Sequence, residues 1–295
     1  MFVQISQYMF RKLPIIIVLI AVLPLTTSAQ RIFYSEPDRN DQKSLNFDVI
    51  GKMNNHYLIY KNYRSDNYIS VFDNEMKLIE NAPLDFAPDK LMGTDIIPYK
   101  EHFYFFYQFQ KRGIAYCMAA KIDGNGKIVG DPLELDTTII NSFSNNRIYN
   151  IINSEDKQHI MVFKINSKNE DRYTLTTSLF DSDLKPQGKS RVYIEMPERS
   201  DFLSEFSLDN KATLAFVRGA GTSENDNIKQ LTLLIKQPDR DSVSYHNLEV
   251  SDMYLDDLKI KIDNVNENYL ITSFYAKLKR GNIDGLYCAL WDKKE

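Results

Sequence analysis

Four acidic side chains on or beside runs of apolar residues could supply a pair of catalytic carboxylates. Glycoside hydrolases use two such groups, one as an acid and the other as a base or nucleophile. The four candidates are Asp48, Asp95, Glu205 and Asp257. Asp48 and Asp95 are both followed by two β-branched residues, so their settings are alike. A carboxylate that repeats in one setting is more typical of a structural position than of an asymmetric catalytic pair, and the four are weak candidates.

Five arginines form a second candidate site, for ligand binding. One falls between the second and third strand-like runs of each of five successive segments: Arg64, Arg112, Arg172, Arg218 and Arg280. Guanidinium groups gathered on one face could bind a carboxylate, sulfate or phosphate through paired hydrogen bonds. The alternative is that each is a solvated loop residue that pairs with a nearby acid.

A long connection follows the fourth of these arginines. The stretch Arg218–Asn227 contains two glycines, and long loops are often functional. The glycines would let the backbone approach a ligand closely. A mobile surface insertion would have the same composition, so both interpretations stay open.

The remaining motifs predict no metal site, cofactor or disulfide. His56, His102 and His159 occupy equivalent places in successive segments, and equivalent places around a ring lie too far apart to share one metal ion. A shared role in a turn explains the repetition better. Cys117 and Cys288 are the only cysteines and fall in different segments, so we expect two free thiols.

The elements that carry these residues repeat with a period of about 50 residues. Each repeat contains four strand-like runs separated by turn residues. The second run usually begins with His or Asn, and the third usually ends with an apolar residue and Asp, as at Asp73, Asp123, Asp181 and Asp292. The repeats span residues 46–86, 93–135, 146–196, 202–250 and 254–295, and the fourth is the poorest copy.

This pattern predicts an all-β fold, a β-propeller of about five four-stranded blades within residues 30–295. The fifth repeat lacks its fourth run. Residues 31–36 include a strand-like run that could supply it and close the ring. The alternative is a truncated piece of a larger propeller.

In repeat length and strand pattern the chain resembles the broad β-propeller superfamily over roughly residues 31–295. The signatures of kelch and WD40 repeats are absent. The composition, rich in Asn, Lys, Ile and Tyr, is similar to that of exported proteins of Bacteroidota. Propellers include enzymes, lectins and scaffolds, so the resemblance implies a fold and no particular activity.

The first 29 residues predict a signal peptide. Arg11 and Lys12 precede an uncharged run, Leu13–Leu25, and small residues at Thr27–Ala29 suit a cleavage site. The run is too short for a stable membrane span, although an uncleaved anchor is the alternative. We therefore expect an exported protein, periplasmic or extracellular. A net charge of -4 with mixed signs argues against nucleic-acid binding.

Together these features predict a binding or scaffold module without a cofactor. Its partner would be a glycan, a peptide or a protein at the cell surface. Binding would use the face that carries the loops between the second and third strands and between successive repeats. The alternative is a carbohydrate-active enzyme, a glycoside hydrolase whose channel carboxylates do the chemistry.

Overall fold

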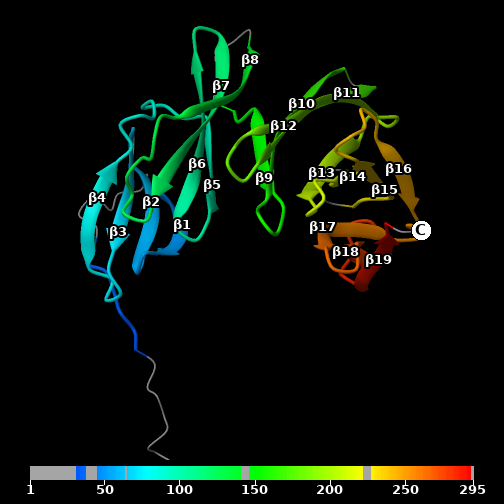
Figure 1. The fold of residues 1–295 in the computed structure, drawn as a ribbon. Coiled ribbons are helices and arrows are strands. Elements are labelled where there is room, and N and C mark those ends of the chain that lie inside the picture. Colours follow the sequence, from blue (N-terminus) through cyan, green and yellow to red (C-terminus); the bar gives the residue numbers. More distant parts are fainter. Residues whose placement is uncertain are drawn as a thin grey trace, which may run out of the picture.

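The computed structural model describes residues 31–37, 45–63, 65–140, 146–169, 171–221 and 227–293. The predicted signal peptide and Arg64 lie outside these ranges. The described part is all-β, as expected, and folds as a β-propeller in which five antiparallel sheets follow one another around an open arc (Figure 1). None of its helices is long and apolar enough to cross a membrane.

Each sheet, called a blade here, is a meander of consecutive strands. Blade 1 contains β1 (Leu45–Met53), β2 (His56–Tyr63), β3 (Asp66–Phe72) and β4 (Leu78–Pro83). Blade 2 contains β5 (Gly93–Pro98), β6 (His102–Lys111), β7 (Ile114–Asp123) and β8 (Leu133–Ile139). Blade 3 contains β9 (Tyr149–Asn153), β10 (His159–Asn169), β11 (Arg172–Asp181) and β12 (Pro186–Glu195). Blade 4 contains β13 (Asp201–Leu208), β14 (Leu214–Ala220), β15 (Gln230–Lys236) and β16 (Ser244–Leu248). Blade 5 contains three described strands, β17 (Tyr254–Asp263), β18 (Asn268–Ala276) and β19 (Gly285–Asp292).

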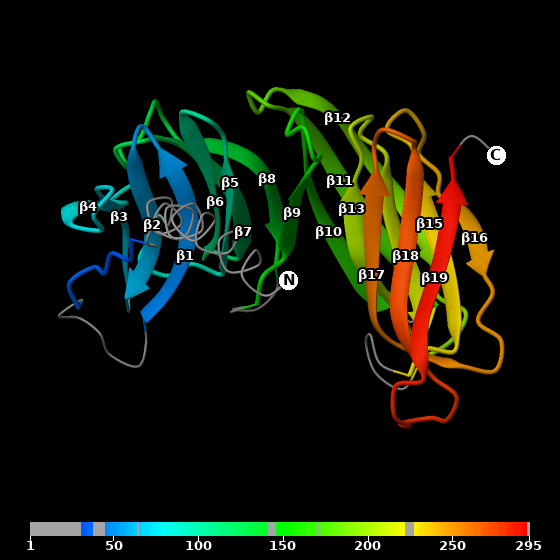
Figure 2. The ribbon, with the colours of Figure 1, turned by 90° about the horizontal axis from the view of Figure 1, so that it is seen from below.

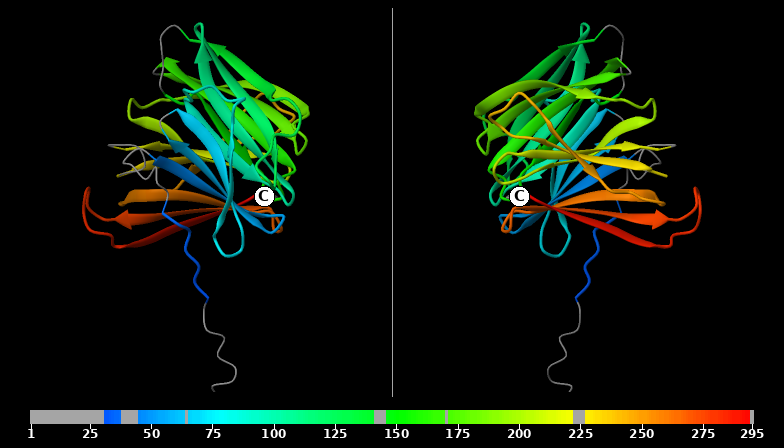
Figure 3. Two further views of the ribbon diagram at one scale, coloured as in Figure 1. Left: turned by 90° about the vertical axis from the view of Figure 1, so that its left-hand side faces the viewer. Right: turned by 90° about the vertical axis from the view of Figure 1, so that its right-hand side faces the viewer.

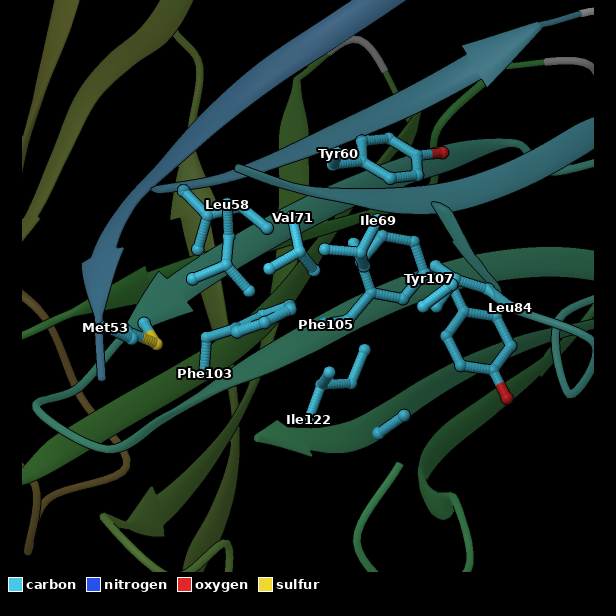
Figure 4. Packing of buried hydrophobic residues seen from close by; sticks show 13 residues of the cluster. Met53, Leu58, Tyr60, Ile69, Val71, Leu84, Phe103, Phe105, Tyr107 and Ile122 are labelled. Carbon is cyan, nitrogen blue, oxygen red and sulfur yellow. The ribbon is translucent and has the colours of Figure 1, made fainter. Parts of the chain in front are cut away.

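The core consists of layers of apolar side chains between neighbouring blades. Successive residues of a strand point to opposite faces, so each second strand of a blade contributes to two layers. In β6, Phe103 and Phe105 pack against blade 1, whereas Tyr104 and Phe106 pack against blade 3. Figure 4 shows the first of these layers, where Leu58 of blade 1 lies beside the two phenylalanines. Figure 3 shows the blades fanning out one behind another.

The aspartates that mark the ends of the third strands cap the turns that follow. The Oδ1 of Asp73 accepts hydrogen bonds from the backbone N–H groups of Glu75 and Lys77, at 2.8 and 2.9 Å. Asp123 and Asp181 make the same pair of bonds in blades 2 and 3. Three residues after each aspartate the backbone is left-handed, at Met76, Gly126 and Leu184. The repeated sequence marker therefore specifies one turn geometry in three blades.

The closing strand expected from residues 31–36 is not formed in this structure. Residues 31–37 have no regular structure and are exposed, with Tyr34 83% exposed. Among the described strands, β19 is hydrogen-bonded only to β18. In the described part of the chain blade 5 therefore has three strands, and the arc is open between blades 1 and 5 (Figure 1).

Candidate binding groove between blades 2 and 3

The face of blade 3 that points toward blade 2 is apolar in one half and polar in the other. On β10 this face begins with Ile160 and Val162, which are buried against blade 2. The same face continues with Lys164 and Asn166, which are polar. The blade is long enough for both halves because β10 contains 11 residues. The apolar half packs against blade 2, and the polar half extends beyond the core.

A groove of about 1040 Å³ lies where the polar half of blade 3 stands apart from blade 2. We call it the interblade groove. One wall is the outer strand β8 of blade 2, with Thr137, Thr138, Ile139 and the following Ile140. The other wall is the face of blade 3, with Lys164, Asn166, Thr174, Thr176, Arg191 and Tyr193. It is large enough for a ligand of several sugar rings or a short peptide.

Blade 2 and blade 3 are held together below the groove by a buried glutamine. Gln108 is 1% exposed. Its amide donates to the carbonyl of Tyr149 at 2.7 Å, and its oxygen accepts from the N–H groups of Ile148 and Tyr149. This side chain of β6 therefore joins blade 2 to the backbone at the start of β9 in blade 3.

The floor of the groove is fixed by a partly buried ion pair. Lys164 donates to Asp136 at 2.6 Å, and Lys189 reaches the other carboxylate oxygen at 2.8 Å. Lys164 also donates to Thr138, whose hydroxyl lies 2.8 Å from that of Tyr149. Burial favours the neutral form of Asp136, but the two lysines outweigh it and hold the pKa of this carboxyl below its usual value. The groove is thus preorganised, with one of its lysines already neutralised.

Two guanidinium groups at the groove carry no ion pair among the described residues. Arg191 lines it directly and is exposed. Arg172, one of the five arginines expected from the sequence, lies over the ring of Tyr193, with 5.4 Å from its Cζ atom to the ring centroid. Tyr193 is 56% exposed. An exposed aromatic ring beside available guanidinium groups suits a polar ligand that carries negative charge.

A second arginine–tyrosine pair adjoins the first across blades 3 and 4. Arg218 lies over the ring of Tyr245, with 5.6 Å from Cζ to the centroid, and donates to the carbonyl of Glu195 at 2.6 Å. The hydroxyl of Tyr245 accepts from the N–H of Glu195 at 3.3 Å. Arg218 lies within β14 and not in a loop, so its guanidinium serves largely to join the two blades.

Two of the other expected arginines lie in turns between strands. Arg112 occupies the tight turn between β6 and β7 with a positive φ of 49°. Arg280 lies between β18 and β19 with a φ of 57°, and its N–H donates to the side chain of Asn227 at 2.7 Å. Arg64 is not described. Of the five arginines, the structure therefore places Arg172 at the groove and Arg218 next to it.

The four candidate acids fall into two separate pairs. Asp48 on β1 and Asp95 on β5 lie close enough to interact electrostatically. Burial raises the pKa of the Asp95 carboxyl, although Arg147, whose Nη2 is 2.6 Å from its Oδ2, opposes the shift. Asp48 also lines a pocket of about 570 Å³ with Tyr60 and Thr94. Glycoside hydrolysis requires two carboxyl groups that flank one bond, so this pair is the one to test for catalysis.

Glu205 and Asp257 meet at one lysine. Lys259 lies 3.3 Å from Glu205 and 3.5 Å from Asp257. Both acids occupy β-bulges in the inner strands β13 and β17, and both have a positive φ of 55°. They therefore neutralise a cation between blades 4 and 5.

The histidines and cysteines are spread over several blades. His56, His102 and His159 each begin the second strand of a different blade. Within the described residues no group of three or more possible ligands could hold a metal ion. Cys117 is buried in blade 2 and Cys288 is exposed in blade 5. Burial raises the pKa of the Cys117 thiol strongly, so this thiol is unreactive in the folded chain.

Comparison with known proteins finds no matching family and no matching curated protein. Solved structures with a similar course include a mutant of the Synechocystis apocarotenoid oxygenase, with 10% identity and a TM-score of 0.44 over 84% of this chain and 59% of that chain. The cobalt-substituted form of the same oxygenase has 9% identity and a TM-score of 0.42 over 80% of this chain and 57% of that chain. A thermostable family-43 glycoside hydrolase gives 9% identity and a TM-score of 0.35 over 83% of this chain and 89% of that chain.

The chain thus spans less than two thirds of the oxygenase chains that it matches. At these identities and TM-scores the comparisons assign no activity to it. The functional argument therefore rests on its own residues.

Proposed function

We propose that this chain is a binding module of an exported protein and that it holds an acidic glycan in the interblade groove. The observation that carries the proposal is the lining of that groove. Tyr193 offers an exposed ring, Arg172 and Arg191 offer guanidinium groups, and threonine hydroxyls line both walls.

Each part of the lining has a role in such binding. A tyrosine ring presents a rigid, amphipathic surface at low entropic cost, on which the apolar face of a sugar ring can stack. Arginine matches the planar geometry of a carboxylate and donates two parallel hydrogen bonds. The hydroxyl groups of Thr174 and Thr176 and the amide of Asn166 can exchange hydrogen bonds with sugar hydroxyls. A peptide with acidic side chains would satisfy the cations but not the row of hydroxyl groups as fully.

Export is part of the same proposal, and it is supported by the sequence alone. The basic residues Arg11 and Lys12, the apolar run and the small residues before Gln30 have the order of a secretory signal. Expression of the full chain in a bacterium, followed by mass analysis of the periplasmic fraction, tests it. A product that begins near Gln30 supports export, and an uncleaved product retained in the cytoplasm contradicts it.

The test of binding is calorimetric titration with chondroitin sulfate as the acidic probe and dextran as the neutral one. Tyr193→Ala and Arg191→Ala should each weaken binding of the acidic probe by about tenfold or more, because aromatic and arginine side chains dominate binding energies. Arg240→Ala, a matched loss of an exposed arginine in the turn between β15 and β16, should leave the affinity unchanged. Equal binding by all four proteins, or no binding by the native chain, would overturn the proposal.

Glycoside hydrolysis is a second candidate, favoured by the pairing of Asp48 with Asp95. The raised pKa of Asp95 suits a general acid, and Asp48 beside it would be the base or nucleophile. Asp95→Asn and Asp48→Asn should then each abolish release of nitrophenol from aryl glycosides. Absence of hydrolysis by the native chain across a panel of such substrates contradicts this candidate.

A further inference from the structure

The connection between β18 and β19 projects from blade 5 and is longer than its counterparts in blades 2 and 3. It runs from Lys277 to Asp284, whereas the same connection in blade 2 is the turn of Arg112 and Gly113 alone. Figure 2 shows it as a red loop that extends beyond the ends of the strands. We call residues 277–284 the blade 5 loop.

The exposure of this loop does not depend on what lies beside blade 5. Blade 2 has a neighbour on each side, and yet Lys111 and Arg112, at the tip of its equivalent hairpin, are exposed. Neighbouring blades pack against the faces of a sheet, and the tips of its hairpins stay in solvent. Every residue of the blade 5 loop is exposed in the same way.

Hydrogen bonds hold the blade 5 loop in a defined shape. At its base, the N–H of Lys277 donates to the carboxylate of Asp284 at 2.7 Å, and the N–H of Asp284 donates to the carbonyl of Tyr275 at 2.8 Å. At its tip, the N–H of Gly281 donates to the carbonyl of Leu278 at 2.9 Å. A Cβ atom on Gly281 would lie 2.9 Å from that carbonyl oxygen, so a larger residue would force the turn open. The loop is therefore preorganised.

The blade 5 loop presents large apolar side chains and cations together. Leu278 is 73% exposed and Ile283 is 63% exposed. Three cations are exposed beside them: Lys277, Lys279 and Arg280. No ion pair among the described residues involves these three. Asp284 is the only acid of the loop, so the loop is positive although the whole chain has a net charge of -4.

We propose that the blade 5 loop docks this protein on an anionic lipid surface. Leu278 and Ile283 enter the boundary between the headgroups and the acyl chains, where burial of side chains of this size is favourable. The three cations lie at the level of the lipid phosphates, and each adds attraction close to an anionic surface. The contact is peripheral, because only the loop enters the lipid.

A lipid surface suits this loop better than a small ligand does. The loop projects, whereas pockets of about 470, 570 and 1040 Å³ lie on blades 1 to 3. A fluid membrane can deform around a projecting tip, and it offers apolar volume directly beneath a layer of negative charge. A protein partner would need a cavity shaped for both apolar side chains, and the experiment separates the two cases.

The proposal is independent of the proposed glycan binding. The interblade groove is lined by residues of blades 2 and 3, and none of them belongs to the blade 5 loop. Either site can therefore fail its test without affecting the other.

Co-sedimentation with lipid vesicles measures the docking. Residues 30–295 are the chain to use, because every described strand lies between Leu45 and Asp292 and the apolar run Leu13–Leu25 could bind lipid by itself. We expect binding to vesicles of phosphatidylglycerol and phosphatidylcholine in equal parts. Binding to phosphatidylcholine alone should be weaker by about tenfold or more, and high salt should weaken the binding to anionic vesicles.

Substitutions in the loop test both of its components. Leu278→Ser and Ile283→Ser should each weaken binding to anionic vesicles by about tenfold, because an apolar side chain no longer enters the lipid. Lys279→Gln should weaken it by about fivefold, through loss of one cation near the surface.

Blade 5 also supplies matched controls. Val265→Ser removes an apolar side chain that is 88% exposed in the turn between β17 and β18, at the opposite end of the blade, and should leave binding unchanged. Lys261→Gln removes an exposed cation within β17 and should also have no effect. All the substituted side chains are exposed, so the urea unfolding midpoints should match that of the native chain and exclude misfolding.

Three results would overturn the proposal. One is a native chain that does not bind anionic vesicles, which would leave the loop to a protein partner. Another is binding that neither serine substitution in the loop weakens, which would mean attraction by charge alone or through another surface. The last is an equal loss of binding in Val265→Ser, which would mean apolar adhesion without a defined site.

Discussion

Asp209 joins blade 4 to blade 5, and its replacement by asparagine should destabilise the fold in a pH-dependent way. The aspartate follows β13 and its side chain is 8% exposed. One oxygen accepts from the hydroxyl of Tyr269 at 2.8 Å and from Lys293 at 2.9 Å. The other accepts from the N–H groups of Thr213 and Lys211 at 2.7 and 2.9 Å. Four donors therefore converge on one carboxylate.

The magnitude follows from what asparagine keeps and what it loses. Its amide oxygen can still accept from the two backbone N–H groups, but its NH2 group faces the lysine and cannot accept. Lys293, 16% exposed, would be left largely buried without its anion. Loss of one partner of such a pair costs about 2–4 kcal/mol, which lies between a charged hydrogen bond and a fully buried ion pair. Asp209→Asn should therefore lower the free energy of unfolding by about 2–4 kcal/mol at pH 7.

The pH dependence has a defined sign. Burial favours the neutral acid, but Lys293, the Thr213 N–H and Tyr269 outweigh it, so the pKa of Asp209 lies below its usual value in the folded chain. A carboxyl with a lowered pKa stabilises the fold above its unfolded pKa of about 3.9, and this contribution is lost as the pH falls through the folded value. The difference in the free energy of unfolding between the native and the variant chain should therefore be constant from pH 7 to about 5 and decrease below about pH 4.

Urea unfolding followed by tryptophan fluorescence at several pH values measures this difference. Asp89→Asn, an exposed aspartate in the connection between β4 and β5, is the matched control and should change stability by less than about 0.5 kcal/mol. Lys293→Met added to Asp209→Asn should restore part of the loss, because it removes the uncompensated cation. The reasoning fails if Asp209→Asn costs under about 0.5 kcal/mol at pH 7, or if its effect is the same at pH 3.

Three further predictions concern the turns and the core. Asp123→Ala removes the acceptor of two backbone N–H groups and should cost about 1–2 kcal/mol in urea unfolding; no loss would mean that the turn does not need its cap. Met76→Gly should stabilise the chain by about 0.5–1 kcal/mol in thermal unfolding, because φ there is 60°, and a lower stability would contradict the strain argument. Phe105→Ala should cost about 3–5 kcal/mol in the same assay, because the fully buried ring lies 5.0 Å from that of Tyr60, and a cost under about 1.5 kcal/mol would refute the packing described here.

The fold class could be predicted because the propeller is built from local signals that repeat. Each repeat contains its own signals within a few tens of residues. These are a strand of alternating residues, a turn that begins with Asp123 or its equivalent, and a following strand. The structure confirms the all-β propeller, and it gives the repeated aspartates their physical role as turn caps. The closure of the ring could not be predicted, because it depends on contacts between segments that lie at opposite ends of the sequence.

The interblade groove was not predicted, although a signal for it exists. Sequence reasoning placed ligand binding at loop arginines, whereas Lys164, Asn166 and Tyr193 lie on strands. A polar residue on an alternating strand usually indicates a solvated face. The informative feature is that one face of β10 changes from Ile160 and Val162 to Lys164 and Asn166 without a break in the strand. A change from apolar to polar residues on one face of a strand indicates where the sheet extends beyond the core.

Arg218 illustrates the opposite error. The glycines that follow it, Gly219 and Gly221, are typical of a loop. Arg218 nevertheless belongs to β14, because its neighbours pair regularly with β15. Its guanidinium contacts the backbone of blade 3, a partner that sequence spacing does not reveal. The packing of neighbouring blades determines which distant groups a charged side chain meets. This packing cannot be predicted from the sequence of a single repeat.

Hydrogen–deuterium exchange of the full chain with and without chondroitin sulfate is the most direct test of the central claim, that the interblade groove is the binding site. The account predicts slower exchange in residues 133–140 of blade 2 and in residues 164–176 and 189–195 of blade 3, with little change elsewhere. Slower exchange confined to the pocket of Asp48, or no change in any segment, would contradict it.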